Sequence, residues 1–293
     1  MPTPTRRHGL RRTLSALLTG IVVLVVSFVL MVSWREGHAE ARDAFPTVVQ
    51  QGAMIVGRVT PGSDVLFAGR RLRVSPEGWV VFGVGRDAQG PVEVTVRAPK
   101  GQRTVTKIDV APRDWPIEQV RGVPPKTVAP PPALVERIRR EQAAVTQARV
   151  RDDDRNAFLQ PFIWPVQGRV SGRFGNQRVY NGTPGAAHSG MDIAAAEGTP
   201  VKAPADGVVT FAAPALYLTG GTLLLDHGFG ISSNFLHLSA LDVKVGDTVR
   251  QGQVIGNVGA TGRATGPHLH WGMNWFDVRL DPLLVLERTT PHH

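Results

Sequence analysis

Histidine is concentrated in the second half of the chain, where it could serve metal binding or proton transfer. Two spacings stand out there: His188 precedes Asp192 by four residues, and His268 precedes His270 by two. Imidazole nitrogens and carboxylate oxygens bind divalent transition metals, and imidazole also exchanges protons near neutral pH. The question is whether these side chains meet at one site. Five of the nine histidines lie in this stretch: His188, His227, His237, His268 and His270.

Alternation along β-strands would bring each pair of spaced residues to one face. Side chains two or four residues apart in a strand point to the same side of a sheet. His268 and His270 would then share a face, and His188 and Asp192 could converge in the same way. Two imidazoles and one carboxylate form a ligand set for catalytic zinc that leaves a fourth position open for water. Spacing alone does not decide whether His268 or His270 supplies the second imidazole.

The chain lacks some residue types and motifs, and their absence excludes several kinds of catalytic site. The chain has no cysteine, which excludes disulfides, thiolate metal sites and a thiol nucleophile. The His-Glu-x-x-His motif is absent, and Glu197 and Glu287 are the only glutamates after residue 160. Proton transfer would therefore fall to histidine. A single His-x-His pair is more often structural than metal-binding, and His227 is interpreted as a turn histidine outside the site.

The distribution of charge argues against a nucleic-acid partner. The net charge is +9, but residues 1–160 carry 24 basic and 15 acidic residues, whereas residues 161–293 carry nine of each. Nucleic-acid-binding modules usually have a basic excess on the binding domain itself. We therefore expect the histidine-bearing region to bind neither DNA nor RNA.

The elements that must position the histidines are predicted to be mainly β. Residues 161–286 contain short apolar runs separated by glycines and no long helical pattern, which predicts an antiparallel β-sheet domain. Residues 46–112 contain about six strand patterns separated by turn signals, which predicts a small, immunoglobulin-like β-sandwich.

Residues 113–160 are predicted to link these two regions. The prolines at 124–125 and 130–132 favour an extended, Pro-rich linker. Residues 133–158 are rich in helix formers and predict one amphipathic helix. Its apolar residues fall on roughly one face: Leu134, Ile138, Val145 and Ala148.

The N-terminus has the pattern of a membrane anchor. Four arginines lie within residues 1–12, and residues 13–34 form an uncharged, mostly apolar run. As a helix this run would span the roughly 30 Å hydrocarbon layer. The positive-inside rule predicts one span in the cytoplasmic membrane, with the C-terminal domain outside, periplasmic or extracellular. The alternative is a cleaved signal segment and secretion, because Ala39-Glu40-Ala41 resembles a cleavage site.

Residues 164–282 resemble the catalytic domain of lysostaphin- and LytM-type zinc metalloendopeptidases, which cut peptide cross-bridges in bacterial cell walls. The matching motifs occur in the family's order over roughly two fifths of the chain. They are Trp164-Pro-Val, Ser171-Gly-Arg-Phe-Gly175, His188-Ser-Gly-Met-Asp-Ile193, Gly198-Thr-Pro-Val-Lys-Ala203, Gly207-Val-Val, His237-Leu-Ser239, Val249-Arg-Gln-Gly-Gln-Val-Ile-Gly256 and Thr261-Gly-Arg-Ala-Thr-Gly-Pro-His-Leu-His270.

The resemblance implies a role for each of five residues. It implies Zn2+ held by His188, Asp192 and His270, with His237 and His268 as catalytic residues. A zinc-bound water would attack the scissile carbonyl, and the two histidines would orient or deprotonate it and stabilise the oxyanion. The implied substrates are the cross-links or stem peptides of peptidoglycan.

Two other functions are compatible with the same resemblance. Some relatives have lost zinc ligands and activate cell-wall amidases without being enzymes themselves, although the intact ligand set argues against that here. A zinc peptidase with a protein target is the other alternative. In either case residues 46–112 could contact cell-wall or division proteins, or could block the groove.

Overall fold

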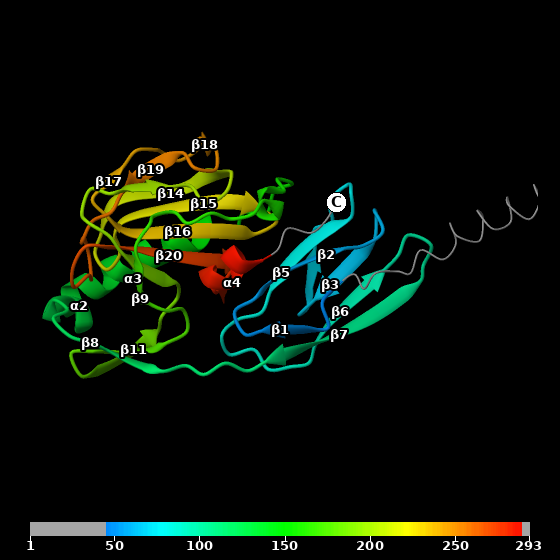
Figure 1. Cartoon of the computed structure of the whole chain (residues 1–293), viewed down its shortest axis with the longest axis horizontal. Coiled ribbons are helices and arrows are strands. Elements are labelled where there is room, and N and C mark those ends of the chain that lie inside the picture. The colour runs from blue at the N-terminus through cyan, green and yellow to red at the C-terminus, as the bar shows by residue number, and fades with distance from the viewer. Residues whose placement is uncertain (1–44, 289–293) are drawn as a thin grey trace, which may run out of the picture. The chain divides into compact units, whose positions relative to one another are not determined.

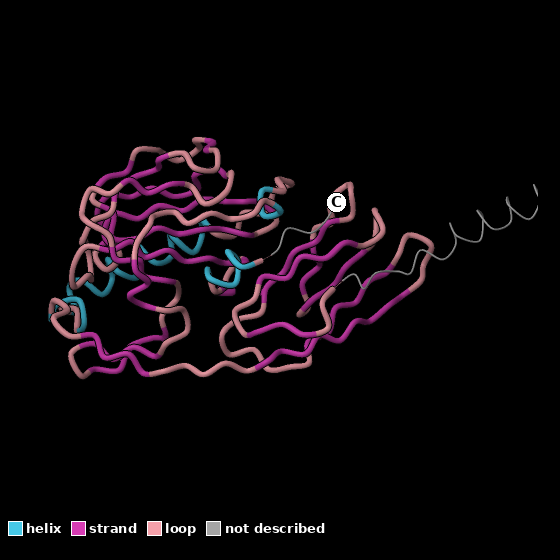
Figure 2. Tube along the Cα trace, in the orientation of Figure 1, coloured by secondary structure: helices cyan, strands magenta, loops and turns pink. Residues whose placement is uncertain are grey.

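The computed structural model describes residues 45–288, and most of its regular elements are β-strands, as predicted (Figures 1 and 2). These residues belong to one compact unit. The predicted anchor at residues 13–34 lies outside the described residues. Within residues 45–288, no helix is both long enough and apolar enough to cross a membrane.

The largest element is an antiparallel sheet of eight strands, in agreement with the prediction for residues 161–286. Its strand order is β18-β14-β15-β16-β20-β12-β9, and β21 pairs with β20. Strands that are far apart in sequence pair at three places: β14 with β18, β16 with β20, and β12 with β20. The strands are β9 (Arg169–Gly172), β12 (Met191–Ala194), β14 (Gly207–Leu216), β15 (Gly220–Gly228), β16 (Ile231–Leu238), β18 (Thr248–Val249), β20 (His268–Trp275) and β21 (Val278–Leu280).

Strand β20 separates the core from the face that carries the histidines. Leu269, Trp271 and Met273 are fully buried on one side. In the register they lie opposite residues of β12 and β16 that are equally buried, such as Phe235, which lies opposite Trp271. Burying each large side chain contributes roughly 1.5–3 kcal/mol. This core holds β20 rigidly and leaves alternate residues for the other face.

Two three-stranded sheets flank the large one. The first has the order β13-β19-β17, and the second has the order β11-β10-β8. Strand β8 pairs in parallel with β10, so part of the predicted linker enters the second sheet as a strand. The strands are β13 (Pro200–Lys202), β17 (Ala240–Leu241), β19 (Val254–Asn257), β8 (Ile117–Val120), β10 (Gln177–Tyr180) and β11 (Thr183–Ala187).

Residues 48–111 form seven strands in two sheets. A five-stranded sheet has the order β1-β7-β6-β3-β4, and β2 pairs with β5. The Phe67 ring of β3 packs on the Phe82 ring of β5, with centroids 4.3 Å apart. The immunoglobulin-like character and the boundaries 46–112 and 161–286 stay predictions. The strands are β1 (Val48–Gln50), β2 (Met54–Arg58), β3 (Asp64–Phe67), β4 (Arg70–Leu72), β5 (Trp79–Gly83), β6 (Val92–Arg97) and β7 (Arg103–Ala111).

These strands contact the end of the large sheet. The Phe67 ring lies 5.8 Å from the Trp275 ring of β20. Arg113 Nη1 lies 2.8 Å from Asp281 Oδ2, whose side chain is only 2% exposed. Asp281 also accepts a hydrogen bond from Leu283 N and so caps helix α4 (Pro282–Glu287). Buried apolar and charged contacts therefore join the two β regions.

The prediction for residues 113–160 is wrong in two respects. Pro124 and Pro131 are extended, with ψ of 120° and 146°, but Pro125 begins helix α2 (Pro125–Val128) and Pro132 begins helix α3 (Pro132–Ala148), so the segment as a whole is not extended. Proline fits the first turn of a helix, where its missing N–H has no intrahelical partner to lose. The predicted helix also ends at Ala148 rather than at residue 158. Beyond it, Asp153 accepts from Arg155 N and Arg151 Nε, local bonds that compete with helix formation.

The amphipathic face predicted for this helix is confirmed. No residue of α3 is fully buried, and the apolar residues of the predicted face are half-buried. A short 3₁₀ turn at Ala157–Leu159 follows and buries Phe158.

Candidate metal centre

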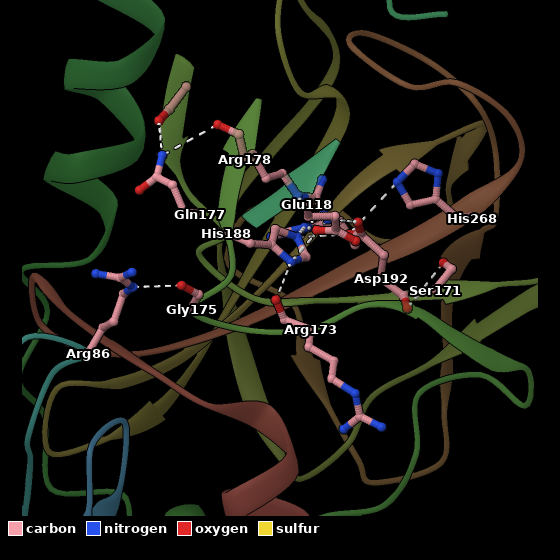
Figure 3. Close-up of polar contacts among 12 residues, drawn as sticks. Arg86, Glu118, Ser171, Arg173, Gly175, Gln177, Arg178, His188, Asp192 and His268 are labelled. Carbon is pink, nitrogen blue, oxygen red and sulfur yellow. Dashed lines mark hydrogen bonds and ion pairs between the residues drawn. The ribbon is translucent and has the colours of Figure 1, made fainter. Parts of the chain in front are cut away.

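Strands β12 and β20 bring the Asp192 carboxylate and the His270 imidazole together. Their antiparallel register places Asp192 opposite His270. His188 comes from the turn just before β12, and Figure 3 shows its ring beside the Asp192 carboxylate. All three side chains are buried, with 5–6% of each residue exposed. The sheet thus supplies a fixed floor for the site.

The three side chains present their donor atoms to one another. His188 Nε2 lies 3.0 Å from Asp192 Oδ1 and 3.0 Å from His270 Nδ1, and the last two atoms are 2.9 Å apart. His188 Nδ1 lies 2.9 Å from the carbonyl oxygen of Arg173 and 3.2 Å from Arg178 Nη2. If Nδ1 donates in the shorter of these contacts, Nε2 keeps its lone pair. Ligands about 2.0–2.2 Å from a tetrahedral zinc ion lie at comparable separations. These three residues therefore form a group that could hold a metal ion.

The electrostatics of the site suit metal ligation. Burial alone would raise the pKa of Asp192, but the imidazoles of His188 and His270 hold that pKa well below its usual range. Burial lowers the pKa of His270 to about 4, although Asp192 opposes the shift. At neutral pH the carboxylate is therefore ionised and the His270 imidazole neutral, which is the protonation state that binds a cation.

Two more histidines stand beside this group. The His237 and His268 rings are 4.8 Å apart between centroids, and His268 Nε2 lies 3.8 Å from Asp192 Oδ1. Their Nδ1 atoms lie 2.7 Å and 2.8 Å from the carbonyl oxygens of Thr261 and Gly266. Each Nδ1 must donate there, which leaves each Nε2 with a free lone pair.

His237 also has a strained backbone and a deeply buried side chain. It is a non-glycine residue at positive φ, 66°, near the end of β16. Such a conformation costs of order 1–3 kcal/mol and persists only where the surroundings enforce it. Burial, assisted by the charges of His268 and His270, lowers the pKa of His237 to about 3. The ring is therefore neutral at physiological pH, which leaves its Nε2 lone pair free.

The five side chains line one cavity of about 1190 Å³. Leu236 and Asn234 of β16 form part of its floor, and Ile138, Glu141 and Val145 of α3 form part of its wall. Residues 85–88, from the first β region, line it as well. A cavity of this size accommodates a peptide-sized ligand.

Comparison with known proteins agrees with this arrangement. The model of peptidase family M23 matches residues 186–282, a range that includes all five of these side chains. The crystal structure of a candidate M23 peptidase from Pseudomonas aeruginosa is 32% identical, with a TM-score of 0.61, and the match covers 80% of this chain and 94% of that one.

The chain belongs to peptidase family M23.

Curated M23 relatives are longer proteins. The cell division protein DipM of Caulobacter vibrioides is 34% identical over 167 residues, which cover 55% of this chain and 26% of DipM. The peptidoglycan DD-endopeptidase ShyA of Vibrio cholerae is 42% identical over 104 residues, which cover 35% of this chain and 24% of ShyA. This chain therefore spans about a quarter of the length of these relatives.

His227 lies outside the M23 site, but not for the predicted reason. It is fully buried inside β15 rather than in a turn. Its Nδ1 lies 2.7 Å from Asp206 O and its Nε2 lies 2.8 Å from Ser233 Oγ. Burial lowers its pKa to about 4, against the opposing effect of Asp206. It is a neutral core residue whose two ring nitrogens are both satisfied.

Two residues at the site had no signal in the sequence. Arg178 of β10 donates from Nη2 to Asp192 Oδ2 at 2.6 Å and from Nε to Glu118 Oε2 at 3.0 Å (Figure 3). Glu118 belongs to β8, 74 residues before Asp192 in the chain, so only the parallel pairing of β8 with β10 brings it close. Arg178 occupies the oxygen of Asp192 that does not face the two imidazoles.

Proposed function

We propose that this protein is a zinc-dependent endopeptidase that hydrolyses peptide cross-links or stem peptides of peptidoglycan. The observation that carries the proposal is the convergence of His188 Nε2, Asp192 Oδ1 and His270 Nδ1 within 2.9–3.0 Å, with two further histidines beside them. Two imidazoles and a carboxylate fit zinc and leave one position open. His188, Asp192 and His270 would hold the ion.

The remaining histidines would handle protons. A bound zinc ion acts as a Lewis acid and lowers the pKa of a coordinated water to about 7. His237 and His268 each have Nδ1 committed to a backbone carbonyl and Nε2 free. One Nε2 would accept the proton of the attacking water, and the imidazolium so formed would donate it to the developing oxyanion or to the leaving amine, while the other Nε2 would accept a hydrogen bond that orients the water.

The substrate class comes from the named relatives. ShyA is a peptidoglycan DD-endopeptidase, and another M23 relative, ALE-1 of Staphylococcus capitis, is a glycyl-glycine endopeptidase. Both names describe cleavage of peptide bonds, but of different bonds. The names of these relatives therefore support peptide hydrolysis in the cell wall, and we expect the cavity lining to select the bond.

The test is hydrolysis of purified sacculi by the full chain in detergent, with zinc and with a chelator. We expect release of soluble muropeptides with zinc, loss with chelator, and loss in Asp192→Asn. Asp242→Asn is the matched control, because Asp242 is exposed and its side chain makes no hydrogen bond or ion pair within residues 45–288. Equal hydrolysis by wild type and Asp192→Asn would refute the proposal.

We also propose that residues 13–34 anchor the enzyme in the cytoplasmic membrane with its catalytic region outside. The support is the uncharged run behind four arginines. The full chain should remain with membranes after an alkaline carbonate wash, and it should be accessible to protease added from outside in spheroplasts. Release of a shortened chain into the medium would instead support signal cleavage.

A further inference from the structure

We propose that Arg149 and Arg279 form a subsite that binds a carboxylate group of the peptide substrate, at a distance from the metal centre. The inference deepens the proposed function and rests on it for the identity of the ligand. Arg149 follows the last residue of α3, and Arg279 lies in the middle of β21. Both side chains line the cavity that contains the histidines.

Unlike two other arginines that line the cavity, neither Arg149 nor Arg279 has a counter-ion among the described residues. Arg86 pairs with Asp87, and Arg178 pairs with both Glu118 and Asp192. Among residues 45–288, no carboxylate oxygen lies within 4.0 Å of a side-chain nitrogen of Arg149 or Arg279. Within residues 45–288, Arg149 and Arg279 are therefore uncompensated charges, as is Arg263, whose guanidinium lies 4.4 Å from the centroid of the Tyr180 ring.

Burial makes the lack of a counter-ion energetically costly for both arginines. Arg149 Nε is buried without a hydrogen-bond partner. Desolvation lowers the pKa of Arg149 to about 9, assisted by repulsion from the charge of Arg279, and desolvation also lowers the pKa of Arg279. Two desolvated like charges destabilise each other, and an anion placed between them would relieve both the desolvation and the repulsion.

The backbone holds Arg279 in place for such a ligand. Arg279 is paired in register with Asn274 of β20. Its Nη1 donates to Asn274 Oδ1 at 3.1 Å, which is the one hydrogen bond of the Arg279 side chain within the described part of the chain. Asn274 is fully buried, so it fixes one edge of the guanidinium and leaves the other nitrogens available. A planar guanidinium with free nitrogens matches the two oxygens of a carboxylate.

The strand geometry sets the distance to the bond that is cut. His270 and Asn274 lie on the same face of β20, four residues apart. At about 3.3 Å per residue, this separation is roughly 13 Å, and an extended peptide covers it in about four residues. The subsite would therefore select peptides that carry a free carboxylate about four residues from the scissile bond.

Binding of soluble wall peptides tests the subsite without turnover. The probe is the mixture of disaccharide-peptide dimers that a muramidase releases from sacculi, either untreated or with its carboxylates converted to amides. Calorimetry would measure affinity for the full chain in detergent with chelator, in wild type, Arg149→Gln and Arg279→Gln. Arg140→Gln is the matched control, because Arg140 is an exposed arginine of the same helix.

We expect wild type and Arg140→Gln to bind the untreated dimers at least about 10-fold more tightly than the amidated dimers, as one charge-assisted contact predicts. Arg149→Gln and Arg279→Gln should bind both forms with similar affinity. If Arg279→Gln does not fold, Arg279→Lys should retain part of the preference, and the two probe forms still test wild type.

Three results would overturn the subsite: equal affinity of wild type for both forms, no binding of either form, or an unchanged preference in both glutamine variants. Binding of inorganic phosphate without binding of the dimers would overturn the carboxylate assignment. The sacculus assay separates this inference from the proposed function. Selective binding without zinc-dependent hydrolysis refutes the peptidase and supports the subsite, whereas hydrolysis without selective binding does the reverse.

Discussion

The carboxyl group of Asp226 provides a stability prediction that can be worked out from its contacts. Asp226 lies near the end of β15 and is 2% exposed. Burial, reinforced by the nearby charge of Asp153, raises its pKa to about 7. Its compensating contacts are limited to a hydrogen bond from Gly228 N at 3.2 Å and Arg151 Nε at 3.3 Å. Ionised Asp226 should therefore destabilise the fold.

Asp226→Asn removes the charge at nearly constant shape. A shift from the ordinary value of 3.8 to about 7 corresponds to at most ~4 kcal/mol against the ionised form, at about 1.4 kcal/mol per pH unit. The variant also loses the half-exposed ion pair with Arg151, worth about 0–1 kcal/mol, and weakens one hydrogen bond worth about 1 kcal/mol. We expect a net gain in the free energy of unfolding of about 2–3 kcal/mol at pH 8.

The gain should depend on pH in a defined direction. Because the folded-state pKa is raised, protonated Asp226 stabilises the fold fully below pH 3.8, and this contribution is lost as pH rises towards about 7. Histidines with lowered pKa values act in the opposite direction. His227 titrates at about 4 when folded, so its contribution increases with pH until the unfolded value of 6.5 is passed. The difference between variant and wild type cancels this histidine effect.

Urea unfolding from pH 4.5 to 8.5 would measure that difference. The advantage of Asp226→Asn over wild type should increase with pH and level off above pH 7. Asp242→Asn, at an exposed site, should show no such trend. A difference that is constant over the whole range, or a variant less stable than wild type at pH 8, would show that Asp226 is ionised in the fold at no cost.

Three further predictions concern the metal centre and its support. In Gly190→Ala, the new Cβ would lie 2.5 Å from Trp271 O and 2.8 Å from His270 Nε2. Displacement of His270 should weaken zinc binding at least about 10-fold, measured in competition with a chelating dye. Unchanged zinc affinity would contradict the assignment of His270 as a ligand. Trp271→Ala should lower the free energy of unfolding in urea titration by about 3–5 kcal/mol, because the ring is fully buried beneath the site. A loss below about 1 kcal/mol would show that the ring lies outside the core. Zinc at 100 times its Kd should stabilise wild type by about 2.7 kcal/mol and raise its Tm. In calorimetry, His188→Ala should show no such rise in Tm. An equal rise in both proteins would show that zinc binds at a different site.

The sequence alone was enough to identify the face that carries the site. Alternation along a strand is a local property, since neighbouring side chains must point to opposite sides of the pleat. The spacing of His268 and His270 therefore predicted a shared face, and the buried residues between them confirm it. Local apolar patterns likewise located the half-buried face of α3. Both predictions needed no knowledge of distant residues.

Local patterns failed where a distant partner decides the outcome. The histidine in Asp226-His227-Gly228 resembles a turn residue, yet its ring is buried because Asp206 and Ser233 satisfy both nitrogens. Such contacts have no periodicity that a sequence could display.

The candidate metal centre also depends partly on the sequence and partly on the tertiary structure. The sequence determines which side chains are available for the site. Only the register of β12 against β20 places Asp192 Oδ1 2.9 Å from His270 Nδ1. The contact of Arg178 with Glu118 and the uncompensated pair of Arg149 and Arg279 join segments 60 and 130 residues apart. Hydrogen bonding and electrostatics act over a few ångströms in space, whatever the separation along the chain, so the tertiary fold alone decided which charges met a partner and which did not.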